Sequence, residues 1–138
     1  MDNLARIISP GSDAAVADAV ISDAEAAAAL RAVVKLFALW GLTDQQAADL
    51  LDLPVRTYRR WKAGEAGRIG RDGRARLSNL LGIHKSLRLI FAEPARGYAW
   101  VKAPNDAFGG KSALQVMLGG ELSDLNRVRA YLDAERGW

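Results

Sequence analysis

Three segments of this chain begin with a residue pair that is typical of helix starts. The pairs, each spaced by three residues, are Ser22 with Glu25, Thr43 with Gln46 and Ser112 with Gln115. In such a capping box, each side chain accepts a hydrogen bond from a backbone N–H that the first helical turn leaves unpaired. No segment shows the alternating β-branched pattern of a half-buried strand. The sequence therefore predicts an all-α fold.

Glycine and proline divide the predicted helices. The first helix runs from Ser22 to Gly41, the second follows Thr43, the third covers 54–63 and the fourth covers 71–81. Gly82 is expected to break or kink the chain before the apolar segment 83–91, because glycine is unfavourable inside a helix. A short helical turn at 94–100, a turn-rich segment at 101–110, a short helix after Ser112 and an amphipathic helix at 122–136 complete the chain. Residues 1–20 are interpreted as a loose arm or one short helix.

Composition limits the class of protein. The chain has 138 residues, 50% of them hydrophobic, which suits one small unit or two very small ones. It has no cysteine, so disulfides, cysteine-ligated zinc and thiol catalysis are excluded. No apolar run approaches the roughly 18–20 residues that span a bilayer, and the first residues lack the order of a secretory signal. We expect a cytoplasmic protein without a membrane partner.

The net charge of +3 conceals an uneven distribution. Acidic residues dominate positions 1–30, whereas eight lysines and arginines lie between 56 and 76, opposed there only by Glu65 and Asp72. A local basic cluster is typical of a surface that binds a polyanion. From charge alone, a solvated helix surface is an equally good interpretation.

The segment 42–62 has the pattern of a helix-turn-helix, in which two short helices are joined by a tight turn and the second is basic. Tyr58 and Trp61 are three residues apart and are expected to anchor the second helix in the core. The outward side chains of such a helix contact bases and phosphates of DNA. The residues predicted to bind DNA are Val55, Arg56, Thr57, Arg59, Arg60 and Lys62. The alternative is a helical hairpin whose basic face is merely solvated.

No pattern for catalysis, metal or cofactor binding emerges. Gly110-Lys111-Ser112 resembles the end of a phosphate-binding loop, but that motif needs a glycine at position 105, where Asn105 stands. His84 is the only histidine, and no catalytic set or metal-ligand spacing forms around it. We therefore expect a protein that is not an enzyme and that needs no cofactor or metal.

Three segments together resemble a known family. They are 76–87, the run 104–120 with Ala107-Phe108-Gly109-Gly110 at its centre, and 124–134. On these residues the chain resembles the Xre/MbcA/ParS-type antitoxins, which partner RES-domain toxins. Pro54 stands where the family usually has a polar cap, and Ala113 where it often has proline.

The resemblance implies an arm at 1–21, a helix-turn-helix and dimerisation domain at 22–82, and a toxin-binding domain at 83–138. The first domain would form a homodimer and bind the operator DNA of its own operon in the bacterial cytoplasm. The second would cover the active site of a cognate RES-domain toxin that consumes NAD. A stand-alone helix-turn-helix regulator with a non-toxin partner is the alternative.

The predicted toxin-binding residues lie at two places in the last domain. They are Phe108, Gly109, Gly110, Arg127, Tyr131, Glu135, Arg136 and Trp138. A large aromatic side chain such as that of Trp138 usually serves as an interface anchor or a core plug. One hypothesis is that Trp138, its carboxylate and Arg136 reach the mouth of the toxin's NAD pocket. The other is that Trp138 folds back on Tyr131.

Overall fold

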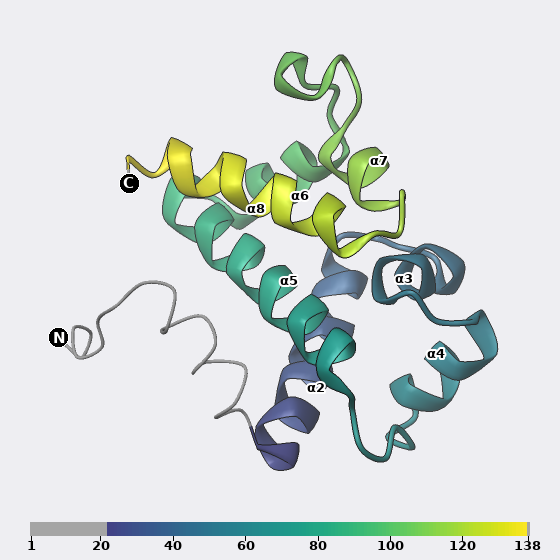
Figure 1. The fold of residues 1–138 in the computed structure, drawn as a ribbon. Coiled ribbons are helices and arrows are strands. Elements are labelled where there is room, and N and C mark those ends of the chain that lie inside the picture. Colours follow the sequence, from purple (N-terminus) through teal and green to yellow (C-terminus); the bar gives the residue numbers. More distant parts are fainter. Residues whose placement is uncertain (1–21, 138) are drawn as a thin grey trace, which may run out of the picture.

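A computed structural model describes residues 22–137 of the chain; the predicted arm at 1–21 and Trp138 lie outside the described residues. The α-helices are α2 (Asp23–Leu39), α3 (Asp44–Leu51), α4 (Val55–Lys62), α5 (Arg71–Ile90), α6 (Pro94–Lys102), α7 (Ala113–Met117) and α8 (Leu122–Glu135) (Figure 1). A short 3-10 helix, η2 (Asp106–Phe108), lies between α6 and α7. Over 22–137 the structure has no strand, only an isolated bridge between Pro104 and Ser112. The all-α prediction is confirmed.

All three predicted capping boxes are formed, and they begin α2, α3 and α7. At α2, the N–H of Glu25 donates to Ser22 Oγ at 3.0 Å and the N–H of Ser22 donates to Glu25 Oε1 at 2.9 Å. The same reciprocal pairs form between Thr43 and Gln46, and between Ser112 and Gln115. These bonds satisfy backbone donors that the first turn leaves free, so the starts of these helices follow from local sequence.

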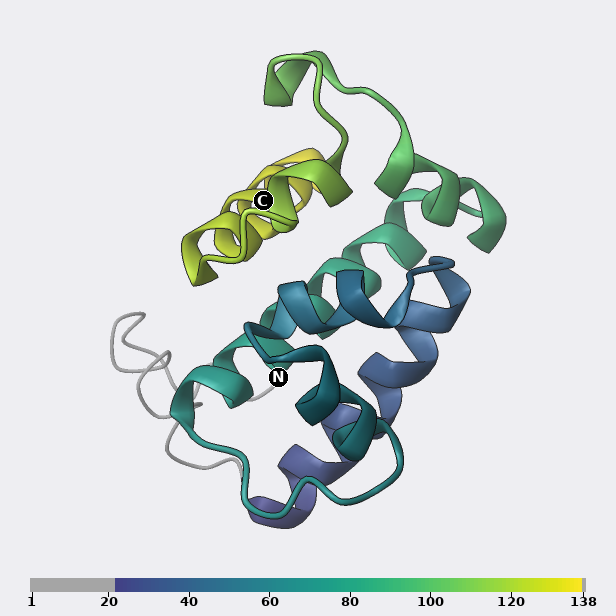
Figure 2. The ribbon, with the colours of Figure 1, turned by 90° about the vertical axis from the view of Figure 1, so that its right-hand side faces the viewer.

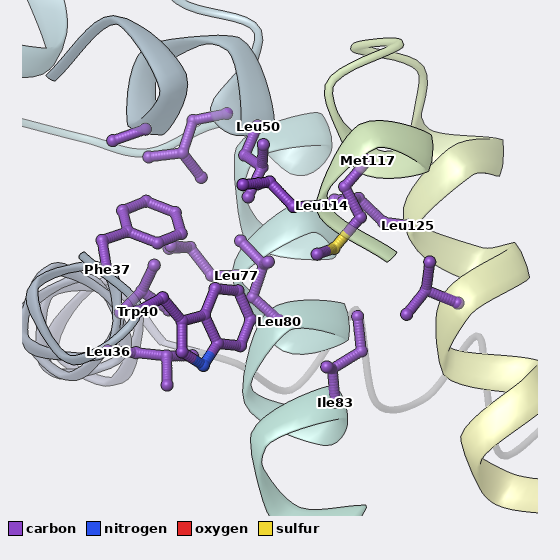
Figure 3. Packing of buried hydrophobic residues seen from close by; sticks show 14 of the residues in the cluster. Leu36, Phe37, Trp40, Leu50, Leu77, Leu80, Ile83, Leu114, Met117 and Leu125 are labelled. Atoms are coloured by element: carbon purple, nitrogen blue, oxygen red, sulfur yellow. The ribbon is translucent and has the colours of Figure 1, made fainter. Parts of the chain in front are cut away.

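The long helix α5 lies at the centre of the fold, with α2 and α3 on one side and α6 and α8 on the other (Figure 1). One apolar core surrounds it. Fully buried residues include Phe37 of α2, Trp40 at its C-cap, Leu50 of α3, Leu77, Leu80 and Ile83 of α5, Met117 of α7 and Leu125 of α8 (Figure 3). Each such side chain contributes roughly 1.5–3 kcal/mol when fully buried. The core is therefore continuous from the first described helix to the last.

The predicted break at Gly82 is wrong, because α5 continues through this residue from Arg71 to Ile90. Gly82 instead leaves room for the Arg129 side chain of α8. A Cβ atom at this position would lie only 2.4 Å from Cζ of Arg129. The glycine therefore lets this guanidinium lie against α5, and the predicted boundary between 82 and 83 falls inside one continuous helix.

Tertiary burial also decides two details that local sequence left open. Leu39 and Trp40 both suited the apolar face of the first helix, but Trp40 is 2% exposed and Leu39 is 53% exposed. The helix predicted at 94–100 extends to Lys102, because Val101 is completely buried. Within residues 22–137, no helix is both long enough and apolar enough to cross a membrane.

Candidate nucleic-acid interface and partner-binding surface

Helices α3 and α4 form the predicted helix-turn-helix. Ala47 and Ala48 of α3 are fully buried, as a close approach between two helices requires. Tyr58 of α4 is buried against Phe37, with ring centroids 6.1 Å apart. Burial, together with the negative charge of Asp44, raises the pKa of the Tyr58 hydroxyl to about 12. Tyr58 anchors α4 in the core as predicted, and Trp61 is half-buried beside it.

The turn between the two helices depends on unusual backbone geometry. Asp52 adopts a left-handed conformation with φ of +54°, and the N–H of Leu53 donates to the carbonyl of Ala48 at 2.9 Å. Pro54 occupies the N-cap of α4 and provides no side-chain cap. Because proline has no N–H, it cannot donate to the carbonyl of Leu50, four residues before it.

Arg76 of α5 supplies that missing donor. Its Nη1 donates to the carbonyl oxygen of Leu50 at 3.2 Å, and its Nε donates to Asp72 at 2.8 Å. The Arg76 side chain is only 4% exposed. This arginine is one of the eight cations of the basic segment 56–76, but it holds the turn rather than facing solvent.

The predicted DNA-binding residues of α4 fall into three groups. Arg56 and Arg60 are exposed, and neither makes a side-chain hydrogen bond or ion pair with another residue of 22–137. Val55 and Thr57 are half-buried. Arg59 and Lys62 are exposed but paired with the same carboxylate, that of Asp44 at the start of α3.

Asp44 is a residue of this surface that the sequence analysis did not identify. Its two oxygens accept hydrogen bonds from Arg59 Nε at 3.2 Å and from Lys62 Nζ at 3.0 Å. Those bonds, first from Lys62 and then from Arg59, lower the pKa of the Asp44 carboxyl. The single carboxylate therefore offsets one of the two positive charges on that side of α4. Within residues 22–137, Arg56 and Arg60 keep their charges unpaired.

The second surface is built around the loop between α6 and α7, which projects beyond the helices (Figure 1, Figure 2). Gly109 and Gly110 have φ angles of +66° and +88°, so they form the sharp turn expected of them. The N–H of Gly110 donates to the carbonyl of Asn105 at 3.0 Å, which closes the loop on itself. Both glycines are exposed at its tip.

An aromatic cluster fixes this loop to α6 and α8. The buried ring of Phe108 packs against Tyr131 at 5.3 Å and Trp100 at 6.2 Å, and the Trp100 and Tyr131 rings are stacked. The guanidinium of Arg127 lies 5.3 Å from the centre of the Phe108 ring. Arg127 and Tyr131, four residues apart on α8, therefore share one face. Trp100 is a member of this cluster that sequence reasoning missed.

The far end of α8 is held to α5 by a polar network. Ser86 is fully buried; its hydroxyl donates to Asp133 at 3.1 Å and accepts from Arg136 Nη1 at 3.1 Å. Arg136 and the exposed Glu135 adjoin a cavity of about 450 Å³ lined also by Leu89 and Ile90. The two predicted partner-binding residues here are thus next to an exposed apolar patch.

By residue type, the acidic side chains and His84 are the candidates for metal binding. No group of three or more histidine, aspartate, glutamate or cysteine side chains in 22–137 could hold a metal ion. His84 Nδ1 is buried without a hydrogen-bond partner. Burial, followed by the positive charge of Arg88, lowers the pKa of His84.

Two family models match the segments of the chain that carry these two surfaces. The antitoxin Xre-like helix-turn-helix domain matches residues 19–82, and the antitoxin Xre/MbcA/ParS C-terminal toxin-binding domain matches residues 86–137. The chain is also 40% identical over 111 residues to an uncharacterized protein, y4oB, of Sinorhizobium fredii (strain NBRC 101917 / NGR234). That alignment covers 80% of this chain and 85% of the relative.

Proposed function

Because the chain belongs to the Xre/MbcA/ParS-type antitoxins, we propose that it neutralises a RES-domain toxin that consumes NAD and represses its own operon. It acts in the bacterial cytoplasm, and it binds operator DNA as a homodimer. The observation that carries the proposal is the pair of surfaces at opposite sides of α5. One presents unpaired arginines, and the other presents a rigid loop over an aromatic cluster.

The toxin binds the surface around Phe108. Exposed Gly109 and Gly110 let a partner backbone approach closely, and the buried rings below them keep the loop rigid before binding. A preformed loop loses little conformational freedom on association, which favours affinity. Arg127 adds an exposed cation, and Glu135 and Arg136 extend the contact toward the end of α8. The side chain of Trp138 then reaches the mouth of the toxin's NAD pocket.

Operator binding depends on Arg56 and Arg60, which can each contact a base edge in the major groove, a contact worth about 1–3 kcal/mol. Val55 and Thr57 lie against the groove wall, and Arg59 and Lys62 approach phosphates beside Asp44. A dimer would place two copies of α4 in half-sites one helical turn apart, about 34–36 Å.

Reciprocal variants test both activities in one experiment. The antitoxin is co-expressed with the neighbouring reading frame, and growth and operator affinity are measured for each variant. Arg127→Glu is expected to weaken toxin binding at least tenfold, a loss of about 1.4 kcal/mol, while operator binding remains. The double variant Arg56→Ala, Arg60→Ala should lose operator binding while growth protection remains.

Two outcomes would contradict the proposal. If the neighbouring frame does not arrest growth, or if the purified chain does not bind it, the chain is a stand-alone regulator. If the double variant Arg56→Ala, Arg60→Ala binds the operator with normal affinity, α4 is not the recognition helix. Deletion of Gly137 and Trp138 tests the pocket contact separately: toxin activity should return, and unchanged protection would refute that contact.

A further inference from the structure

A groove of about 400 Å³ lies between α2 and the segment that follows α4. Its apolar lining includes Leu30 and Val34 of α2 and Trp61 of α4. Leu30 and Val34 are four residues apart and lie one above the other on the same face of α2. This volume lies in the range of pockets that enclose a ligand, about 300–1,000 Å³. The groove can therefore accept several apolar side chains.

The rim of the groove is positively charged. Arg31, Lys35 and Lys62 line it, and none of the acidic residues in the described range 22–137 does. Arg31 and Lys35 make no ion pair with any residue between 22 and 137, whereas Lys62 is bound to Asp44. An occupant with apolar side chains and carboxylates would complement both the lining and the rim.

The first 21 residues of the sequence have those two properties. Leu4, Ile7 and Ile8 have the i, i+3, i+4 spacing of one helical face, and the segment contains Asp2, Asp13 and Asp18 against a single Arg6. The segment is also attached beside the groove, because Ser22 is the N-cap of α2.

Length permits the segment to reach the groove. Along α2, Val34 is 12 residues beyond Ser22, or about 18 Å at 1.5 Å per residue. The 14 residues from Ile8 to Ser22 can span up to about 46 Å when extended. Pro10-Gly11 provides a place for the chain to reverse its direction.

We propose that residues 2–13 of the same chain dock in this groove, with Leu4, Ile7 and Ile8 against Val34 and Trp61 and with aspartates at the basic rim. The docked segment lies beside the C-terminal end of α4. Its carboxylates therefore compete with DNA phosphates for Lys62 and the neighbouring cations, and the segment lowers DNA affinity.

Spin labelling tests the docking without reference to any function. The chain has no cysteine, so Ser9→Cys gives a single site for a nitroxide in the full-length protein. Paramagnetic broadening is measured on the amide signals of ¹⁵N-labelled protein. The signals of Leu30, Val34 and Ala63 should lose at least half of their intensity, and those of α8 should not change.

A rim variant and a matched control establish the cause. The double variant Arg31→Glu, Lys35→Glu should restore the groove signals, whereas Lys85→Glu, an exposed charge reversal on α5 outside the groove, should leave them broadened. A mixing experiment separates docking within one chain from docking between two copies. Chains that carry the nitroxide but no ¹⁵N are mixed with ¹⁵N-labelled chains that carry no nitroxide. Broadening seen only in this mixture would show that a second copy fills the groove, and would overturn the proposal. Absence of broadening at the groove would overturn it as well.

The regulatory consequence rests on the proposed operator binding and is measured separately. The variant Ile7→Asn, Ile8→Asn should release the segment and raise affinity for DNA about threefold to tenfold at low salt. Unchanged affinity in a protein that shows the broadening would refute the competition with DNA but not the docking. Failure of the unaltered chain to bind DNA would refute the operator proposal, while the broadening result would still stand.

Discussion

Replacement of Arg76 by methionine should destabilise the whole domain although Arg76 belongs to a segment rich in surface cations. Arg76→Met keeps a long unbranched side chain but removes every donor. The carbonyl of Leu50 then has no partner, because Pro54 cannot supply the usual N–H and Arg76 Nη1 is the donor that replaces it. Leu50 is completely buried, so water cannot easily take the place of the arginine.

The magnitude follows from the individual contacts. A hydrogen bond from a charged group contributes about 1.5–3 kcal/mol, and an unsatisfied buried acceptor costs a similar amount. The carboxylates of Asp72 and Asp52, by contrast, are 59% and 71% exposed, and their loss as partners matters little. We therefore expect the free energy of unfolding to fall by about 2–3 kcal/mol.

Urea unfolding followed by circular dichroism measures this change. Asp72→Asn is the matched control, because it removes the negative charge beside Arg76, keeps an oxygen that can accept from Nε, and leaves the bond to Leu50. It should cost no more than about 0.5 kcal/mol. Arg76→Lys keeps the charge but lacks the planar guanidinium with its two donor directions. Its loss of unfolding free energy should therefore lie between those of Arg76→Met and Asp72→Asn. A change below 0.5 kcal/mol for Arg76→Met would refute the role of Arg76 at the turn.

Three further predictions concern α5. The folded-state pKa of His84 is lowered, so the unfolded chain binds more protons around pH 6. The free energy of unfolding should therefore fall as the pH drops below about 6.5. The urea midpoint of His84→Asn should vary less between pH 5 and 7.5 than that of the unaltered protein. Ser86→Ala should lower the free energy of unfolding by about 1–2 kcal/mol and increase hydrogen exchange at the end of α8. A fragment of residues 22–82 should lack a cooperative thermal transition, because it exposes Leu77 and Leu80; a sharp transition would contradict this.

The sequence predicted those parts of the fold whose causes are local. Capping boxes place the starts of α2, α3 and α7 because the bonds that define them span only three residues. The break at Gly82 was predicted by the same local reasoning and is wrong. α5 continues through Gly82, where the neighbouring side chain is that of Arg129, 47 residues away in the chain.

In the candidate sites too, the sequence predicted features with local causes and missed those that depend on distant residues. The composition of α4 and the turn at Gly109 and Gly110 were visible in the sequence. The sequence could not tell which cations are unpaired, because Asp44 lies 15 residues before Arg59 and Arg76 lies 26 residues after Leu50. Trp100 was missed because its partners are on η2 and α8, and only the folded chain brings the three rings together.

The position of α5 also bears on how the two surfaces can influence each other. The two family models meet at residues 82 and 86, inside this helix. Leu80 and Ile83, on either side of that boundary, are buried in the same core as Met117 and Leu125 (Figure 3). A close-packed interior transmits displacement rather than absorbing it. A toxin that shifts α8 would therefore move α5 with it, and through Arg76 the turn that orients α4.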